Sequence, residues 1–337
     1  MGMLWYAREK IAHATIRVVF KLMAKESDSG VFIRIPDRPT EPWMPINRGY
    51  EVEIGDWPDD YSCTGVLYTF TKALARPLKP EGEWRTVTYM ACGLVSDPGK
   101  DATAFTSQTQ TILARLIDQV VAHGGTIERA GGDGFSAFWN APLDDVEHEL
   151  HACEAANAMA LAIAEAARYE PPVLINVGIA TGPVVAGGFG GHGHMTYGVQ
   201  GDAVLLAHKI RALTRHYNSP LIVTEQTRRL AERNFGFLEI DTVTSAPNKP
   251  PTPLYALMGG VMVRASPKFR ALAVFHDHIF QAIRKQNWRV ARDLIAQCRR
   301  LSGANQALYD LHLARIAYYE RNPPGEMWDG AFRSILE

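Results

Sequence analysis

The stretch that decides the fold runs from residue 124 to 142 and reads GGTIERAGGDGFSAFWNAP. The segments TIERA and FSAFW have the composition of short strands, and GGDG stands between them. Because Gly and Asp favour tight turns, this pattern predicts a β-hairpin with Asp133 at its tip. Two more glycine-containing stretches follow, GIATG at 178–182 and YGVQGDAV at 197–204.

Strands and helices alternate around this hairpin. We expect strands at 86–95, 173–179, 184–186 and 221–224, and helices at 106–123, 145–167, 203–216 and 225–233. The helix at 106–123 has apolar residues at helical spacing, which is typical of a helix that packs on a core. The order predicts an α+β fold with a βαββαβ arrangement over 85–258.

The segments before and after this region have different patterns of apolar and polar residues. Residues 14–22 alternate apolar and polar side chains, and short apolar runs at 31–35, 49–56 and 64–68 and a turn at 80–84 follow. This pattern predicts short strands of a partial β-sandwich within 1–84. From residue 267 the apolar spacing is helical, with one helical pair around 280–295 and a further helix around 308–319, so 266–337 is predicted to be a helical tail.

Composition restricts the function classes. The 337 residues are 47% hydrophobic, and 35 Lys and Arg balance 36 Asp and Glu, which gives no basic stripe for nucleic acid. No apolar run reaches the roughly 18 residues of a membrane span. The four cysteines are dispersed, which is typical of a reduced compartment. We therefore expect a cytoplasmic protein with no membrane span and no nucleic-acid partner.

The order and spacing of the 124–142, 178–182 and 197–204 motifs resemble the catalytic domain of class III adenylate and guanylate cyclases. The resemblance implies a ferredoxin-like βαββαβ domain that forms a homodimer, or a heterodimer with another cyclase domain, and takes ATP or GTP. Residues 28–34, 49–54, 64–68 and 80–84 resemble the 3-keto-disaccharide hydrolase family, a concanavalin-like jelly roll. The tail resembles a tetratricopeptide-like extension.

In this family, two Asp carboxylates hold two divalent ions that activate the ribose hydroxyl and neutralise the triphosphate. The resemblance places the second metal position at Asp133. It places the first in the strand 87–94, where this chain has Cys92, a soft ligand that suits Mg²⁺ poorly. An active domain would require Mg²⁺ or Mn²⁺, and an inactive one would need no cofactor.

The other half of the family's site is also altered. The base-reading positions correspond to Arg129 and Gly198, and Gly198 offers no side chain. The Asn that orients the ribose corresponds to Leu205, which makes no hydrogen bond. The Arg that meets phosphate corresponds to Lys209, which keeps the charge but loses bidentate contact.

These replacements predict a cyclase-like protein in cyclic-nucleotide signalling with impaired catalysis and a regulatory or scaffolding role. One alternative is an active, divergent adenylate cyclase that converts ATP to cyclic AMP and pyrophosphate. Another is a carbohydrate-binding or sugar-modifying protein that works through the N-terminal sheet. The histidine pairs 148/151, 192/194 and 276/278 lack a closing Cys or acidic cluster, so we expect them at the surface or at helix ends.

Overall fold

The computed structural model describes most of the chain, in two compact units. The first lies within 1–83, 142–144 and 186–198, and the second within 84–141, 145–185 and 199–337. The described residues are 28–35, 38–41, 43–55, 59, 61–64, 66–71, 83–95, 102–167, 173–191, 194–244, 250–301, 304–325 and 328–332.

The first unit contains a two-stranded antiparallel sheet. Strand β1 (Asp28–Ile33) pairs with β2 (Tyr50–Gly55), and the short helix α1 (Met44–Arg48) lies between them in sequence. The strand predicted at 64–68 is not one of the named strands, but Leu67 forms an isolated bridge with Val52, and the N–H of Tyr68 donates to the Glu51 carbonyl of β2 at 2.9 Å. The strand predicted at 14–22 lies outside the described residues, and the jelly roll stays a prediction.

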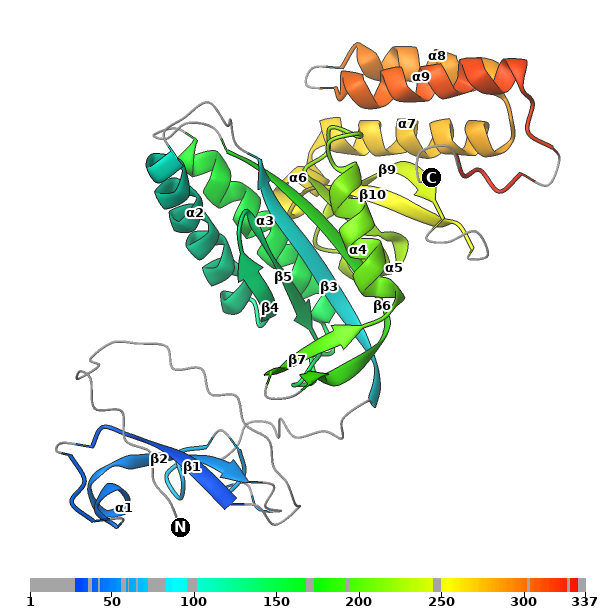
Figure 1. The fold of residues 1–337 in the computed structure, drawn as a ribbon. Helices are drawn as coiled ribbons and strands as arrows, with labels where there is room; N and C mark the ends of the chain where they lie inside the picture. Colours follow the sequence, from blue (N-terminus) through cyan, green and yellow to red (C-terminus); the bar gives the residue numbers. More distant parts are fainter. Residues whose placement is uncertain are drawn as a thin grey trace. The chain divides into compact units, whose positions relative to one another are not determined.

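The second unit is built on a mixed sheet with the order β4-β5-β3-β6-β8-β10-β9, and β7 pairs with β6 (Figure 1). Strands β3, β5 and β4 are antiparallel neighbours, whereas β6 and β8 are parallel. The predicted βαββαβ order is confirmed by the run β3-α2-β4-β5-α3-β6, and with it the α+β class. The bounds are β3 Glu83–Val95, α2 Ala102–Ala122, β4 Thr126–Gly131, β5 Gly134–Trp139, α3 His148–Ala166, β6 Leu174–Gly191, β7 His194–Gln200, α4 Asp202–Leu213, β8 Leu221–Thr224, α5 Glu225–Ala231, β9 Gly236–Val243 and β10 Thr252–Gly259.

Strand β6 is one long strand, so the prediction of two separate strands at 173–179 and 184–186 was wrong. The Gly182-Pro183 pair suggested a break between them. In the structure, a Cβ on Gly182 would lie 3.5 Å from the Cβ of Ala203, so the glycine sits where the start of α4 approaches the strand closely. Tertiary pairing and packing therefore override the local turn preference.

The sheet carries helices on both faces. One face forms the main core, where β3, β5, β6 and β8 pack against α2, α3 and α5 through buried residues such as Met90, Leu116, Met159 and Ala231. The opposite face receives α4. A Cβ on Gly178 of β6 would overlap backbone atoms of α4, so this glycine permits the close approach of helix and strand.

The C-terminal part is helical, as predicted. Helix α6 (Val261–Ala265) precedes α7 (Pro267–Arg284), α8 (Trp288–Arg299) and α9 (Gln306–Arg321), and Figure 1 shows α7, α8 and α9 side by side. Side-chain oxygens of Ser266, Asn287 and Asn305 accept N–H hydrogen bonds at the starts of α7, α8 and α9. These caps satisfy N–H groups that a helix start leaves unpaired.

The helices dock on β9, the last strand in the sheet order. The His276 imidazole of α7 and the His312 imidazole of α9 hydrogen-bond the carbonyls of Glu239 and Ile240 at 2.8 and 2.9 Å. Placing His276 at the surface was therefore wrong, because the ring is buried and covers a sheet edge. Covered edges avoid the unpaired backbone groups that promote aggregation.

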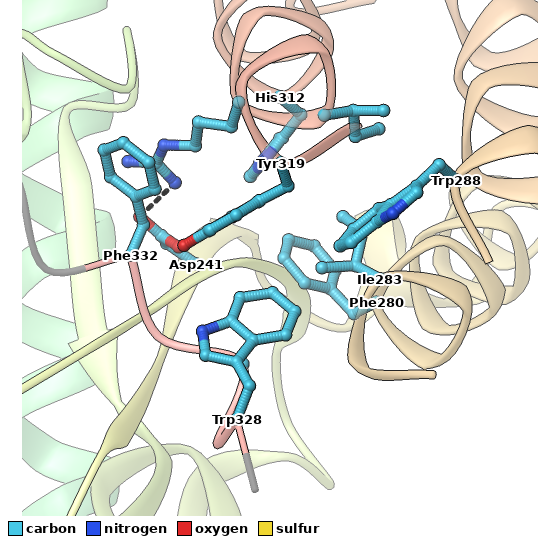
Figure 2. A pocket seen from close by; sticks show the side chains of 11 residues that line it. Asp241, Phe280, Ile283, Trp288, His312, Tyr319, Trp328 and Phe332 are labelled. Atoms are coloured by element: carbon cyan, nitrogen blue, oxygen red, sulfur yellow. Dashed lines mark hydrogen bonds and ion pairs between the residues drawn. The ribbon is translucent and has the colours of Figure 1, made fainter. Parts of the chain in front are cut away.

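A buried ion pair strengthens this docking. The Arg315 guanidinium donates to the Asp241 carboxylate of β9 at 2.7 Å, and the Tyr217 hydroxyl donates to the same carboxylate. Figure 2 shows the Tyr319 ring pointing toward Asp241, next to Trp328. The Trp288 and Tyr319 rings stack at 5.6 Å, and the Trp328 ring lies 4.8 Å from Tyr319.

Replacing Arg315 with Met should lower the free energy of unfolding by about 3–5 kcal/mol, because the Asp241 charge would stay buried without its cation. Urea unfolding measures this loss. The double replacement Arg315→Met with Asp241→Leu should recover most of it, since no charge is then left buried.

The matched control is Arg299→Met, which removes the exposed pair with Asp310 at 2.6 Å and should cost less than about 1 kcal/mol. Equal losses for Arg315→Met and Arg299→Met would contradict this account of the docking.

Candidate functional site

The β4–β5 hairpin positions Asp133 as predicted, at its tip. Gly132 adopts a positive φ of 61°, which the turn requires, and the Asp133 side chain is exposed. The N–H of Leu94 donates to the Asp133 carbonyl at 2.7 Å, so the tip is tied to β3. The hairpin and the strand that carries Cys92 are thereby brought together.

Cys92 lies opposite Phe135 in the ladder between β3 and β5, and its side chain belongs to the main core. The thiol is 2% exposed. Burial raises its pKa to about 12, the nearby Arg211 guanidinium opposes this rise, and the Asp133 carboxylate adds to it. Gly134, next to Asp133, pairs with Gly93 of β3, so the hairpin tip lies at this end of the strand.

The next residue, Gly93, faces the other side of the sheet, because successive strand residues alternate. A Cβ built on Gly93 would overlap the Nη1 atom of Arg211, so the guanidinium lies directly over this glycine. The Nε atom of Arg211 is buried and has no hydrogen-bond partner among the described residues. A positive charge therefore occupies the space next to the hairpin tip.

Beside Arg211 lies a hydrogen-bonded carboxylate. Glu128 accepts from the Tyr89 hydroxyl at 2.5 Å, from the Ser136 hydroxyl at 3.1 Å and from the N–H of Val199 at 3.3 Å. Burial and the Glu128 carboxylate raise the pKa of Tyr89, so the phenol stays protonated and donates. These three donors hold Glu128 in one orientation.

The imidazole of His208 on α4 packs beside this cluster. Its ring centroid lies 5.7 Å from that of Tyr89. Partial burial lowers the pKa of His208. The positive charges of Arg211 and Arg129 lower this pKa further, whereas the Glu128 carboxylate raises it. At neutral pH His208 is therefore mostly uncharged.

The remaining predicted positions are more dispersed. Arg129 is exposed on β4, and Gly198 is buried in β7. Leu205 and Lys209 lie one turn apart on the exposed side of α4, and the Leu205 side chain is 64% exposed. These two side chains occupy a different side of α4 from the backbone that packs on Gly178.

Sequence reasoning missed Gly93, Arg211, Glu128, Tyr89 and His208. One available signal was the alternation along β3, which places Gly93 and Cys92 on opposite faces. Another signal was the position of Arg211 four residues after the buried Ala207, which places it on the buried side of α4. A cation within an apolar stripe is unusual and needs a reason.

Among the described residues at the hairpin tip, the side chains do not supply the ligands for a pair of divalent ions. Mg²⁺ and Mn²⁺ prefer several hard oxygen ligands. Asp133 supplies one carboxylate, Gly93 supplies none, and Cys92 points into the core. Within the described part of the chain, no group of three His, Cys, Asp or Glu side chains could hold a metal ion.

Comparison with known proteins gives two kinds of match. Residues 1–93 match the family model of the 3-keto-alpha-glucoside-1,2-lyase-like domain. Adenylate cyclase 1 of Rhizobium meliloti (strain 1021) is 34% identical over 110 residues, which is 31% of this chain and 16% of that protein. Part of this chain therefore resembles an adenylate cyclase.

The chain is also similar to the following proteins. An uncharacterized protein of Mycobacterium tuberculosis (strain ATCC 25618 / H37Rv) is 35% identical over 120 residues, 35% of this chain and 20% of that protein. The solved guanylyl cyclase Cya2 is 24% identical with a TM-score of 0.48, over 54% of this chain and 95% of Cya2. The adenylyl cyclase CyaB from P. aeruginosa is 20% identical with a TM-score of 0.47, over 53% and 96%.

The chain thus spans about a fifth or less of these two curated relatives. Across the residues that the structure describes, none of the helices has both the length and the apolar character of a membrane span.

Cys92 should resist alkylation in the folded protein, because a pKa of about 12 leaves roughly one thiol in ten thousand ionised at pH 8. Iodoacetamide at pH 8 followed by peptide mass spectrometry measures this. The same treatment in 8 M urea is the control and should modify Cys92 fully. Rapid modification of Cys92 without urea would show that the thiol does not face the core.

Proposed function

We propose that the second unit is a cyclase-derived regulatory or scaffolding module in cyclic-nucleotide signalling, with nucleotidyl cyclase activity impaired or lost. The observation that supports this most strongly is the Arg211 guanidinium over Gly93, beside the hairpin tip that carries Asp133. On the face of β3 that Arg211 covers, position 93 has no side chain and therefore offers no carboxylate beside Asp133.

A guanidinium at this place opposes divalent ions, because it repels an incoming cation. Two-metal catalysis needs both ions to activate the attacking oxygen and to neutralise the leaving group. Loss of the ions therefore removes the main source of rate enhancement in such a site.

The replacement at Leu205 adds to this loss. An oriented hydrogen-bond donor to a developing charge is typically worth a factor of about 10²–10³ in rate. Leucine donates none, and Lys209 binds phosphate as a point charge without a bidentate fork. Because the two losses concern different groups, a partner that supplies one of them would not restore the other.

Association with a second cyclase domain, as a homodimer or heterodimer, is part of the proposal. It rests on the resemblance of the sequence motifs to class III cyclases, which implies such a dimer. Binding of ATP or GTP without turnover is compatible with the cations Arg129 and Lys209.

The test is incubation of the purified chain with ATP or GTP and Mn²⁺, with cyclic nucleotide measured by mass spectrometry. We expect product at the level of the buffer control, and no difference between the unaltered protein and Asp133→Ala. Cyclic AMP formation that Asp133→Ala abolishes would overturn the proposal and support the divergent adenylate cyclase instead.

The match of residues 1–93 favours a second candidate function, binding or modification of a sugar by the first unit. We propose no residue for it. Titration of the full chain with a 3-keto-glucoside in a calorimeter tests it, and absence of binding at millimolar concentration would exclude it.

A further inference from the structure

A pocket of about 280 Å³, open to solvent on one side at Asn218, Pro220 and Met258, lies between the sheet and the C-terminal helices, within the second unit. The floor comes from one face of β9 and β10, and the walls come from α7 and α9. The apolar side chains that define it are Leu238, Ile240, Ala256, Leu272, Leu308 and Met258. Apart from Met258 at the exposed rim, and the partly buried Leu272, these side chains are buried.

This pocket is large enough for a small organic molecule. An engineered, enclosed cavity of about 150 Å³ lined by Leu, Ile and Phe already binds benzene. The present pocket is nearly twice as large, and an apolar occupant would remove its buried apolar wall from contact with water.

Water is a poor occupant, because the buried polar groups at the cavity already have partners. The His276 Nδ1–H donates to the Glu239 carbonyl at 2.8 Å, and the Tyr309 hydroxyl donates to Nε2 at 2.7 Å. The Asn305 amide donates to the carbonyls of Tyr217 and Asn218, and its oxygen caps α9. A buried water needs two to four polar partners, and few remain.

Charge also narrows the choice of occupant. No Lys, Arg, Asp or Glu is among the described residues that line the cavity. Burial lowers the pKa of His276, so this imidazole is neutral and offers no charge to a carboxylate. Hydrogen-bonding groups gather at one end, where Asn218, Ser219 and Asn305 lie together.

We propose that this cavity binds an uncharged, largely apolar small molecule with at most one hydrogen-bonding group. At the packing density of a protein core, the volume suits roughly ten carbon atoms. The bound molecule would contact β9, β10, α7 and α9 at once and would tie the helical tail to the sheet. This proposal does not rest on the cyclase-like function and needs no nucleotide.

The test uses 2-naphthol, a fluorescent molecule with ten carbons and one hydroxyl, added to the full chain. We expect saturable binding with a dissociation constant on the order of 10–100 µM, the range that ligand efficiency gives for so few atoms. 1-Decanol should displace the naphthol, whereas decanoate should not, because its charge would be buried without a partner.

Two variants fill the cavity from different strands, Ala256→Leu on β10 and Leu238→Phe on β9. Both should weaken 2-naphthol binding at least tenfold, whereas the matched control Ala114→Leu, on the exposed side of α2, should leave it unchanged. Without ligand, the filled variants should unfold at the same or a higher temperature than the unaltered protein, since added atoms occupy existing space.

Absence of saturable binding, unchanged affinity in both filled variants, or displacement by decanoate as readily as by decanol would each overturn the proposal. A fall of many degrees in the unfolding temperature of both filled variants would do so as well, because it would show that the space is not there.

Discussion

The contact between the Arg211 guanidinium and Gly93 is the constraint on which the functional account depends. It arises where α4 crosses the sheet. The helix can approach because Gly178 has no side chain, and the guanidinium can reach β3 because Gly93 has none. Any side chain at position 93 would have to shift the Arg211 guanidinium, which moves at low cost because it is the end of a flexible side chain. The two glycines thus allow the guanidinium to lie next to the hairpin tip.

The helical tail is attached to β9 at the edge of the sheet. Two imidazoles donate to consecutive carbonyls of β9, and the buried pair of Arg315 and Asp241 adds a charged contact. Buried ion pairs of this kind contribute less to stability than to a defined geometry. The tail is therefore held in a fixed orientation on the sheet edge, and the cavity beneath α7 and α9 has a defined shape.

Much of the fold could be predicted from the sequence. The GGDG turn and the apolar spacing of 106–123 identified the hairpin and α2, because both depend on local preference. Residues 182 and 183 misled the prediction for β6, since their turn preference is overridden by packing with α4. His276 was assigned to the surface because no local pattern reveals that its partner is a carbonyl 37 residues away.

The candidate site was predictable only in part. Asp133 lies at the predicted hairpin tip, because a turn is a local feature. Arg211 was missed, since its contact with Gly93 joins two elements 118 positions apart and has no signature in either one. The resemblance to cyclases placed the first metal position at Cys92. Because side chains alternate between the two faces of β3, the Cys92 side chain lies in the core.

The most direct test of the central claim is a measurement of Mn²⁺ binding by electron paramagnetic resonance. The unaltered chain should leave the free Mn²⁺ signal unchanged, and the double variant Gly93→Asp with Arg211→Ala should reduce it, because two carboxylates then face the same space. Adding Asp133→Ala to that variant should restore the free signal. Binding of Mn²⁺ by the unaltered chain that is lost in Asp133→Ala would contradict the account.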